Sequence, residues 1–450
     1  MLQIPPHRNI TAVDGNCCRR KMLRRSSFTF YCIGISIIFV WYVLAIMDAK
    51  TSLRKTQGLP FQSYQDSYSH YPTKAQRTKE QPYTFKDTKN MEMHERKLKL
   101  QSWCKTFQER DHDSNIETTR TFFYSKTARF GVCKAPKTGC SFMAKFFFAL
   151  EPQMSVVKAF TMDRYEVHSG AYEYDEDFMF KTLKKKRAFT AVVSRDPFTR
   201  LFSAYIDKVF LIGKLNKKFG LTLRSRLYAT QEESCGYDIS FQGFLDQVVA
   251  MAANGEYDEH WLPVSNLCNP CHLRYDFICK TETLDSDLYQ IVEQLNLSEE
   301  RKEAIKNSIA TEKENKNEVM SLIKTTMYDH RRFKRECPNV LDLMEKTWKS
   351  LQIRGYIHEA SPFPRERFWT TRKGKLKVGK INDEDLINIV YEEFLNRPLT
   401  PKQMTRQRHR SLVRAYLNIK PDTISKIQKV FEYDFFLFNY GLEPPGETKH

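Results

Sequence analysis

Residues 134–142 read KAPKTGCSF, and the segments on either side of them decide the fold. The preceding RFGVC is short and apolar, which is typical of a buried strand. The following FMAKFFFALE places Phe142, Phe146 and Leu150 on one face of a helix. In a strand–loop–helix unit the loop N–H groups and the positive end of the helix dipole converge on one point, which suits a phosphate. Lys137 adds a positive charge there, although the loop lacks the Gly-Lys-Ser/Thr ending found in nucleotide hydrolases.

A second unit of this kind occupies residues 188–210, AFTAVVSRDPFTRLFSAYIDKVF. The apolar run 188–194 predicts a strand, Asp196 can cap the helix that follows, and Pro197 fits the first turn of that helix. The helical period predicts a core-facing stripe of Phe198, Leu201, Phe202, Tyr205 and Val209. It predicts a separate face with Arg200, Ser203 and Asp207.

Arg195 ends the second strand and should therefore lie at the same sheet edge as the first loop. Nucleotides bind at this edge in open α/β sheets. Two anion-binding sites on neighbouring strand ends indicate a ligand with two separated phosphates, one near Lys137 and the other near Arg195 and Ser203. The predicted fold class is α/β.

The chain of 450 residues is strongly basic, with 72 Lys and Arg against 54 Asp and Glu and a net charge of +18. Such a surface attracts anions, namely nucleic acid, an acidic membrane, a nucleotide or an acidic glycan. Charge alone does not choose among them.

An uncharged run at 28–47 matches the roughly 20 residues that cross a bilayer as a helix. It follows a cluster of Arg and Lys, so the N-terminal side should stay cytosolic. The run is longer than the apolar part of a signal peptide and lacks an Ala-x-Ala site, which favours an uncleaved signal anchor. The prediction is a type II membrane protein with a cytoplasmic tail at 1–27, a polar stem at 48–92 and a lumenal domain at 93–450. Nucleic acid is then an improbable partner.

Eight cysteines follow the apolar run. Cys268 and Cys271 have zinc-knuckle spacing, but no second pair follows at a suitable distance, so disulfides are favoured over a metal. No metal site is predicted. The sequon at Asn296 would be lumenal and open to glycosylation, whereas the sequon at Asn9 would be cytosolic.

Four segments resemble the Golgi carbohydrate sulfotransferases, in particular the branch with the chondroitin 4-O-, dermatan 4-O- and HNK-1 enzymes. PKTGCSF resembles their 5′-phosphosulfate loop and SRDPFTRLFSAYIDK their 3′-phosphate motif. The block at 259–284 and the closing FEYDFFLFNYG resemble two further blocks of that branch. Residues 142–145 depart from the Asn-Trp-Lys usual there, and residues 299–420, charged and helical in character, are longer and unfamiliar.

The resemblance implies a P-loop-like sulfotransferase fold, with a central parallel sheet flanked by helices, and 3′-phosphoadenylyl sulfate (PAPS) as sulfate donor. It implies that the 5′-phosphosulfate contacts Pro136, Lys137, Thr138, Gly139, Cys140, Ser141 and Phe142. It implies that the 3′-phosphate motif comprises Arg195, Asp196, Pro197, Phe198, Thr199, Arg200, Leu201, Phe202 and Ser203.

Sulfuryl transfer moves a charged group in line between two oxygens, so positioning and charge stabilisation supply most of the catalysis. Lys137 is the expected stabiliser of the charge on the bridging oxygen. The acceptor hydroxyl needs a base. His168 is the first candidate, since its placement resembles that of the base in heparan sulfate 2-O-sulfotransferases; His260 is the second and Glu282 the third.

Two other functions are compatible with the sequence. A Golgi glycosyltransferase would share the anchor and stem, and its Asp-x-Asp metal motif has a counterpart at Asp285–Asp287, although helix-dipole complementarity also explains those carboxylates. A non-enzymatic binder of acidic glycans would rest on the charge alone. The sequence leaves open whether the glycan acceptor is acidic or neutral, as well as the oligomeric state.

Overall fold

The computed structural model describes residues 93–108, 121–170, 172–185, 188–224, 229–231, 235–312, 317–372, 375–378 and 382–446. All of them belong to one compact unit, Pro82–His450. The predicted tail, membrane anchor and stem, at 1–27, 28–47 and 48–92, lie outside the described residues. Within the described ranges, no helix has the length and apolar character that a membrane crossing requires.

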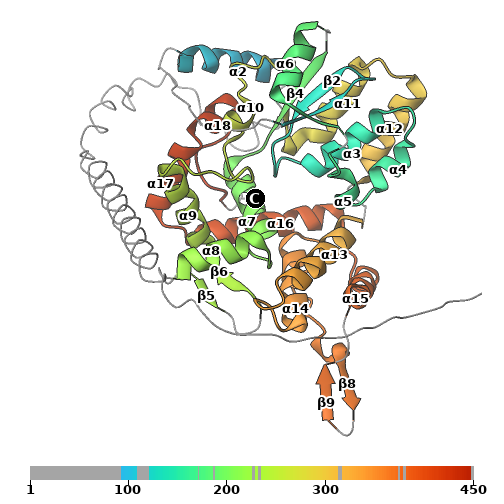
Figure 1. Cartoon of the computed structure of the whole chain (residues 1–450), viewed down its shortest axis with the longest axis vertical. Coiled ribbons are helices and arrows are strands. Elements are labelled where there is room, and N and C mark those ends of the chain that lie inside the picture. Colours follow the sequence, from blue (N-terminus) through green and yellow to red (C-terminus); the bar gives the residue numbers. More distant parts are fainter. Residues whose placement is uncertain are drawn as a thin grey trace, which may run out of the picture. The chain divides into compact units, whose positions relative to one another are not determined.

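A five-stranded sheet with the strand order β3-β1-β2-β4-β7 forms the centre of the fold (Figure 1). Its strands are β1 (Thr121–Ser125), β2 (Phe130–Cys133), β3 (Glu173–Asp175), β4 (Phe189–Ser194) and β7 (Phe277–Lys280). Strands β2, β4 and β7 are parallel, as predicted, whereas β1 pairs antiparallel with both β2 and β3. The sheet is therefore mixed, because the short turn between β1 and β2 permits only an antiparallel neighbour.

Helices cover both faces of the sheet, so the central strands are apolar on both sides. One face buries Ala191 and Val193 of β4 beneath α3 (Cys140–Leu150), α4 (Val156–Thr161), α11 (Leu284–Gln294) and α12 (Glu299–Glu312). The other face buries Val192 of β4. Its helices include α2 (Met93–Gln108), α6 (Glu176–Lys185), α7 (Pro197–Lys208), α9 (Phe241–Ala253) and α10 (Val264–Cys268).

The closing segment of the chain returns to this second face of the sheet. It forms α17 (Pro421–Val430) and α18 (Glu432–Leu437). Phe431, Phe435 and Phe438 are fully buried there. The Asp434 carboxylate of α18 accepts hydrogen bonds from the N–H groups of Val264 and Ser265, which fixes α18 to the start of α10.

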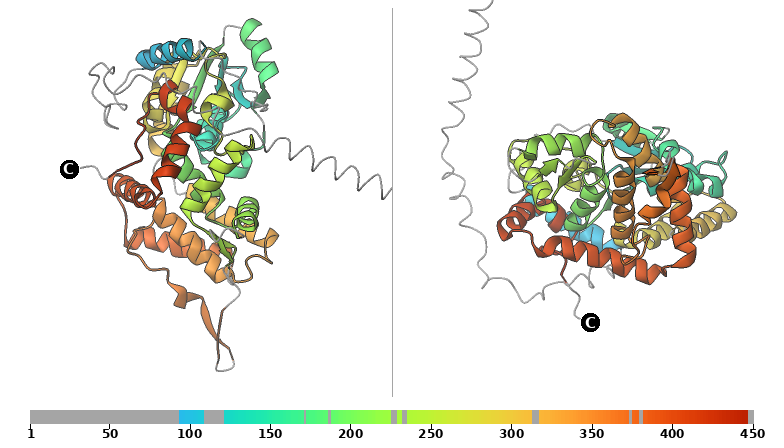
Figure 2. Two further views of the ribbon diagram at one scale, coloured as in Figure 1. Left: turned by 90° about the vertical axis from the view of Figure 1, so that its left-hand side faces the viewer. Right: turned by 90° about the horizontal axis from the view of Figure 1, so that it is seen from below.

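Most of the region predicted to be helical gathers at one end of this unit (Figure 2), whereas its first helix, α12, packs on the sheet. The helices at this end are α13 (Asn317–Arg332), α14 (Val340–Ile353), α15 (Asp383–Asn396) and α16 (Pro401–Leu417). The smaller elements are α5 (Arg164–Val167), α8 (Lys214–Arg224), η5 (Thr281–Thr283), η6 (Arg365–Phe368) and the hairpins β5 (Ala229–Gln231)–β6 (Tyr237–Ile239) and β8 (Trp369–Arg372)–β9 (Lys375–Val378). A separate apolar core joins α13, α14 and α15.

Three disulfides cross-link distant segments: Cys104–Cys271, Cys133–Cys268 and Cys235–Cys337. The preference for disulfides over a metal at Cys268 and Cys271 is confirmed, with each cysteine bonded to a different partner. Because Cys133 is the last residue of β2, the Cys133–Cys268 bond anchors the start of the 134–142 loop to α10. Cys140, within the loop, is a free thiol.

Candidate functional site

The 134–142 loop connects β2 to α3, as predicted, and its backbone leaves helix N–H groups available. Lys137 and Gly139 adopt positive φ angles of 70° and 94°. Gly139 is the N-cap of α3, and no side chain caps that helix end. The first N–H groups of a helix lack intrahelical partners, so those of Cys140, Ser141 and Phe142 are free to bind an anion. The loop thus has the geometry of a phosphate cradle.

Arg200 fixes the underside of the loop. It is one of the largest fully buried side chains, and its guanidinium donates to the carbonyls of Pro136 at 3.0 Å, Leu262 at 2.6 Å and Glu259 at 3.3 Å. Burial lowers its pKa to about 10, which leaves the side chain charged. The helical period predicted Arg200 on a different face from the core stripe. In the structure the side chain is buried, because three backbone carbonyls accept hydrogen bonds from its guanidinium.

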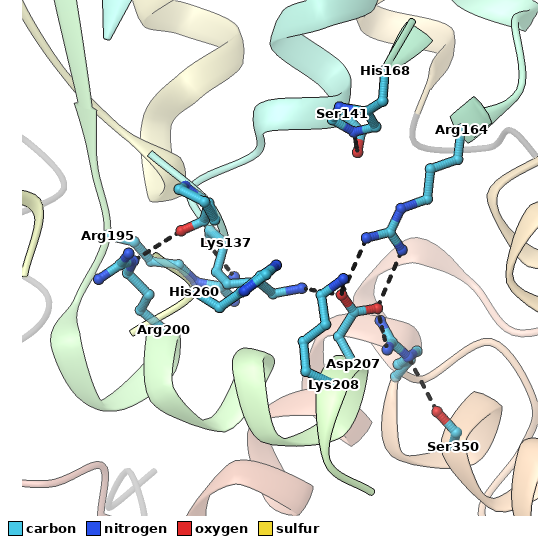
Figure 3. Close-up of polar contacts among 12 residues, drawn as sticks. Lys137, Ser141, Arg164, His168, Arg195, Arg200, Asp207, Lys208, His260 and Ser350 are labelled. Carbon is cyan, nitrogen blue, oxygen red and sulfur yellow. Dashed lines mark hydrogen bonds and ion pairs between the residues drawn. The ribbon is translucent and has the colours of Figure 1, made fainter. Parts of the chain in front are cut away.

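The second predicted loop lies directly beside the first. Asp196 caps α7 by accepting from the Thr199 N–H at 2.8 Å, and Pro197 occupies the first turn. Burial raises the pKa of Asp196 to about 6. Arg195 donates to the carbonyl of Lys137 at 3.0 Å, so the ends of the parallel strands β2 and β4 meet as expected (Figure 3).

The other residues of the 3′-phosphate motif divide between the core and the surface. Phe198 and Leu201 are fully buried, whereas Thr199, Phe202 and Ser203 retain partial exposure. Ser203 lies two turns along α7 from Arg195. The Thr199 hydroxyl donates to Asp196 at 2.8 Å, so Ser203 is the partly exposed hydroxyl of this motif that we assign to a ligand.

Lys137 does not point into solvent but forms an ion pair with Asp207 of α7 at 2.8 Å. Asp207 is only 4% exposed and is shared with Arg164 of α5, Lys208 of α7 and Arg354, which follows α14. Burial would raise the pKa of Asp207, but these cations hold it well below its usual range. Burial lowers the pKa of Lys137 to about 8, against the opposing effect of Asp207.

Sequence reasoning missed most of this cluster. Asp207 was predicted on the same helix face as Ser203, which indicated its direction but not its partners. Arg164 and Arg354 come from distant helices in which nothing in the local sequence marks them.

His168, which follows α5, lies at the start of α3 on the far side of the same region (Figure 3). Its Nε2 atom hydrogen-bonds to the Ser141 hydroxyl at 2.9 Å. Burial, reinforced by Arg164 and Lys134, lowers the pKa of His168 to about 4. The imidazole is therefore neutral near neutral pH and can accept a proton.

His260 follows Glu259, whose carbonyl accepts from Arg200, and it forms a dyad with a carboxylate. Its Nδ1 is 2.6 Å from Oδ1 of Asp258, whose pKa is lowered because the bonds from His260 outweigh burial. An Nδ1–H held by a carboxylate leaves Nε2 as the acceptor, the arrangement that a general base requires.

Glu282, the third candidate for the base, is held by two hydrogen bonds. Its carboxylate accepts from the Asp196 N–H at 3.3 Å and from the Tyr440 hydroxyl at 3.0 Å. Tyr440 also hydrogen-bonds to Ser194, the last residue of β4. The C-terminal signature therefore supports the strand end that carries Arg195.

The Asp285–Asp287 pair lies in the first turn of α11. Asp287 is 2% exposed and is held by Arg96 at 2.7 Å, the Lys280 N–H and the Thr283 hydroxyl. Its carboxylate is therefore occupied by structural contacts. In the part of the chain that the structure describes, no group of three His, Cys, Asp or Glu side chains is arranged to hold a metal ion.

The sequence of the chain is similar to those of known sulfotransferases. Residues 120–349, about half of the chain, match the model of the sulfotransferase family. The chain is 30% identical to carbohydrate sulfotransferase 14 of Danio rerio over 173 residues, which cover 37% of this chain and 46% of that protein. It is 30% identical to carbohydrate sulfotransferase 11 of Mus musculus over 37% of this chain and 50% of that protein, and 34% identical to carbohydrate sulfotransferase 12 of Mus musculus over 28% and 32%.

The matches to these relatives thus span half of their length or less. No solved structure is significantly similar to the chain. The family match nevertheless covers both loops, β4, α7 and β7, and it confirms the resemblance seen in the sequence motifs. The chain therefore belongs to the sulfotransferase family.

Proposed function

We propose that this protein is a PAPS-dependent carbohydrate O-sulfotransferase that transfers a sulfuryl group to a glycan hydroxyl. The observation that carries the proposal is the junction of the two loops, where Arg195 bonds to the carbonyl of Lys137. At this junction an uncapped helix end and a partly buried guanidinium lie at one edge of the parallel strands. The names of the relatives support a carbohydrate acceptor.

The chain's own groups suit the two ends of PAPS. The free N–H groups at the start of α3, with the hydroxyl of Ser141, would hold the 5′-phosphosulfate. The buried Thr138 hydroxyl instead donates to the Ala135 carbonyl at 2.8 Å and so fixes the shape of the loop. Arg195 and Ser203 would hold the 3′-phosphate, because a planar guanidinium binds phosphate through two hydrogen bonds. Bound PAPS supplies the activated sulfuryl group. No protein metal ligand is needed for this scheme.

Lys137 would stabilise the charge that develops on the bridging oxygen when the sulfur–oxygen bond to the 5′-phosphate breaks. Its ion pair with Asp207 keeps the ammonium beside the loop. The acceptor oxygen forms the new bond to sulfur and gives its proton to a base. His168, beside Ser141, is the first candidate for that base, and the His260–Asp258 dyad is the second.

The proposed setting is the Golgi lumen, with a single-pass type II anchor at 28–47 and the catalytic domain, 93–450, in the lumen. The three disulfides suit an oxidising compartment. Asn296 lies exposed in the connection between α11 and α12, where an attached glycan would have room.

Asn296 is accordingly expected to be glycosylated, and Asn9 is not. Treatment of the full chain, expressed in animal cells, with an N-glycosidase should increase its gel mobility. Asn296→Gln should abolish that shift, whereas Asn9→Gln should leave it unchanged. A shift that depends on Asn9 instead would reverse the proposed orientation.

The Arg195→Ala variant tests the two-phosphate site. Losing a charge-assisted contact worth roughly 1.5 to 3 kcal/mol should weaken the binding of adenosine 3′,5′-bisphosphate about 10- to 150-fold. Adenosine 5′-phosphate should bind wild type and variant almost equally, because Arg195 has no 3′-phosphate to contact. Calorimetry with both nucleotides measures the difference. Equal weakening of both would show that Arg195 supports the fold of the loop instead of binding a 3′-phosphate.

A further inference from the structure

The charges around Asp207 do not balance. This one buried carboxylate contacts four cations: Lys137 at 2.8 Å, Arg164 at 3.2 Å, Arg354 at 3.4 Å and Lys208 at 3.7 Å. Two further carboxylates, Glu318 and Asp329, act on Arg164 only at longer range, without an ion-pair contact. The hydroxyl of Tyr356 already donates to Glu318. The cluster therefore keeps an excess of positive charge.

The groups proposed to bind the sulfate donor, PAPS, do not include these excess cations. Lys137 separates two halves of the site: its carbonyl receives the bond from Arg195, while its ammonium reaches Asp207 (Figure 3). The proposed contacts of the 3′-phosphate lie on the Arg195 side. Arg164, Lys208 and Arg354 lie on the opposite side, beyond the ammonium that would face the departing oxygen.

These three cations are also open to a ligand. Their side chains are 34%, 27% and 20% exposed for Arg164, Lys208 and Arg354, whereas Asp207 is 4% exposed. The buried Asp207 carboxylate thus orients the three cations and leaves part of each side chain accessible. Nε of Arg354 donates to Ser350 at 3.2 Å, which fixes the plane of its guanidinium. Arg354 lies just beyond the residues that match the family model, at the C-terminal end of α14.

We propose that Arg164, Lys208 and Arg354 form an acceptor subsite for a negatively charged group, a carboxylate or sulfate, on the sugar that is sulfated or on its neighbour. The inference rests on the proposed sulfotransferase function and narrows its acceptor from any glycan to an acidic one. All three cations contact the carboxylate that also holds Lys137, so an anionic group bound to them would lie close to the Lys137 ammonium. An acidic sugar bound there would present its hydroxyl to the sulfuryl group near Lys137.

The test compares sulfation of three forms of one polymer by the full chain with PAPS. Desulfated chondroitin offers carboxylates only, carboxyl-reduced sulfated chondroitin offers sulfates only, and the carboxyl-reduced, desulfated polymer is neutral. Wild type should prefer at least one acidic form over the neutral form. In Arg354→Gln the ratio of acidic to neutral kcat/KM should fall about 10-fold, mainly through KM, because a charge-assisted contact to the acceptor is lost. The two acidic forms identify the anion.

Arg354→Lys keeps the positive charge, so its ratio of acidic to neutral kcat/KM should lie between those of wild type and Arg354→Gln. Arg410→Gln is the matched control, since Arg410 of α16 pairs with Glu359 and not with Asp207, and its loss should not change the ratio. Binding of adenosine 3′,5′-bisphosphate should match wild type in every variant, which verifies the fold. An equal loss on acidic and neutral polymers in Arg354→Gln, or no loss, overturns the subsite. Failure of wild type to sulfate any polymer would instead overturn the proposed function.

Discussion

Replacing Lys137 with alanine is expected to lower kcat about 100- to 1,000-fold, the usual loss when one preorganised donor to a developing anion is removed. The affinity for adenosine 3′,5′-bisphosphate should change much less, because the charge of Lys137 is most needed when the bridging oxygen becomes negative. Asp207 would keep Arg164, Lys208 and Arg354 as partners, so the variant should still fold. Single-turnover sulfate transfer and calorimetry separate the two effects.

Lys134→Ala is the matched control, because Lys134 belongs to the same loop but pairs with Glu173 at 2.6 Å. It should keep near-normal kcat. The pH profile gives an independent check: the pKa of Lys137 is lowered to about 8, so its charged form predominates below that pH and is lost above it. The kcat/KM of wild type should therefore fall as pH rises through about 8. A Lys137→Ala enzyme that loses affinity and turnover equally would contradict a role confined to the transition state.

The second large effect concerns the base. His168→Ala should lower turnover about 100- to 10,000-fold while leaving cofactor affinity nearly unchanged, since the base acts on the acceptor. The pKa of about 4 at His168 means that the free enzyme keeps a neutral imidazole through mildly acidic pH. Its kcat/KM should accordingly show no acid limb near pH 6.

His260→Ala is the comparison, together with Asp258→Asn, which would disturb the imidazole tautomer without removing the ring. If His168→Ala retains near-normal turnover and both dyad variants lose it, the base is His260. If Ser141→Ala reproduces the turnover loss of His168→Ala and leaves cofactor affinity unchanged, the hydrogen bond between these residues positions the imidazole.

The parts of the site that follow from local patterns could be predicted from the sequence. Each strand–loop–helix unit is encoded within about two dozen residues: an apolar strand, a small-residue or Asp-Pro turn, and a helical stripe. The placement of Arg195 beside the first loop then needs only the rule that parallel strands end at one edge. The structure confirms both units and their proximity.

What could not be predicted depends on tertiary contacts. The antiparallel edge of the sheet follows from the β1–β2 turn, in which Arg129 supplies the positive φ of 50° that a glycine would normally mark. The burial of Arg200 depends on carbonyls contributed by residues some 60 positions away in the sequence. The Asp207 cluster requires α5, α7 and the end of α14 to meet, which no local period encodes.

Sulfate transfer itself tests the central claim most directly. The purified full chain would be supplied with PAPS labelled in its sulfuryl group and with a panel of glycans, acidic and neutral, in the presence of a metal chelator. The account predicts that label appears on a glycan hydroxyl together with an equal amount of adenosine 3′,5′-bisphosphate, and that the Lys137→Ala variant loses this transfer. Absence of label on every glycan, together with transfer of a sugar from a sugar nucleotide when manganese is restored, would contradict it.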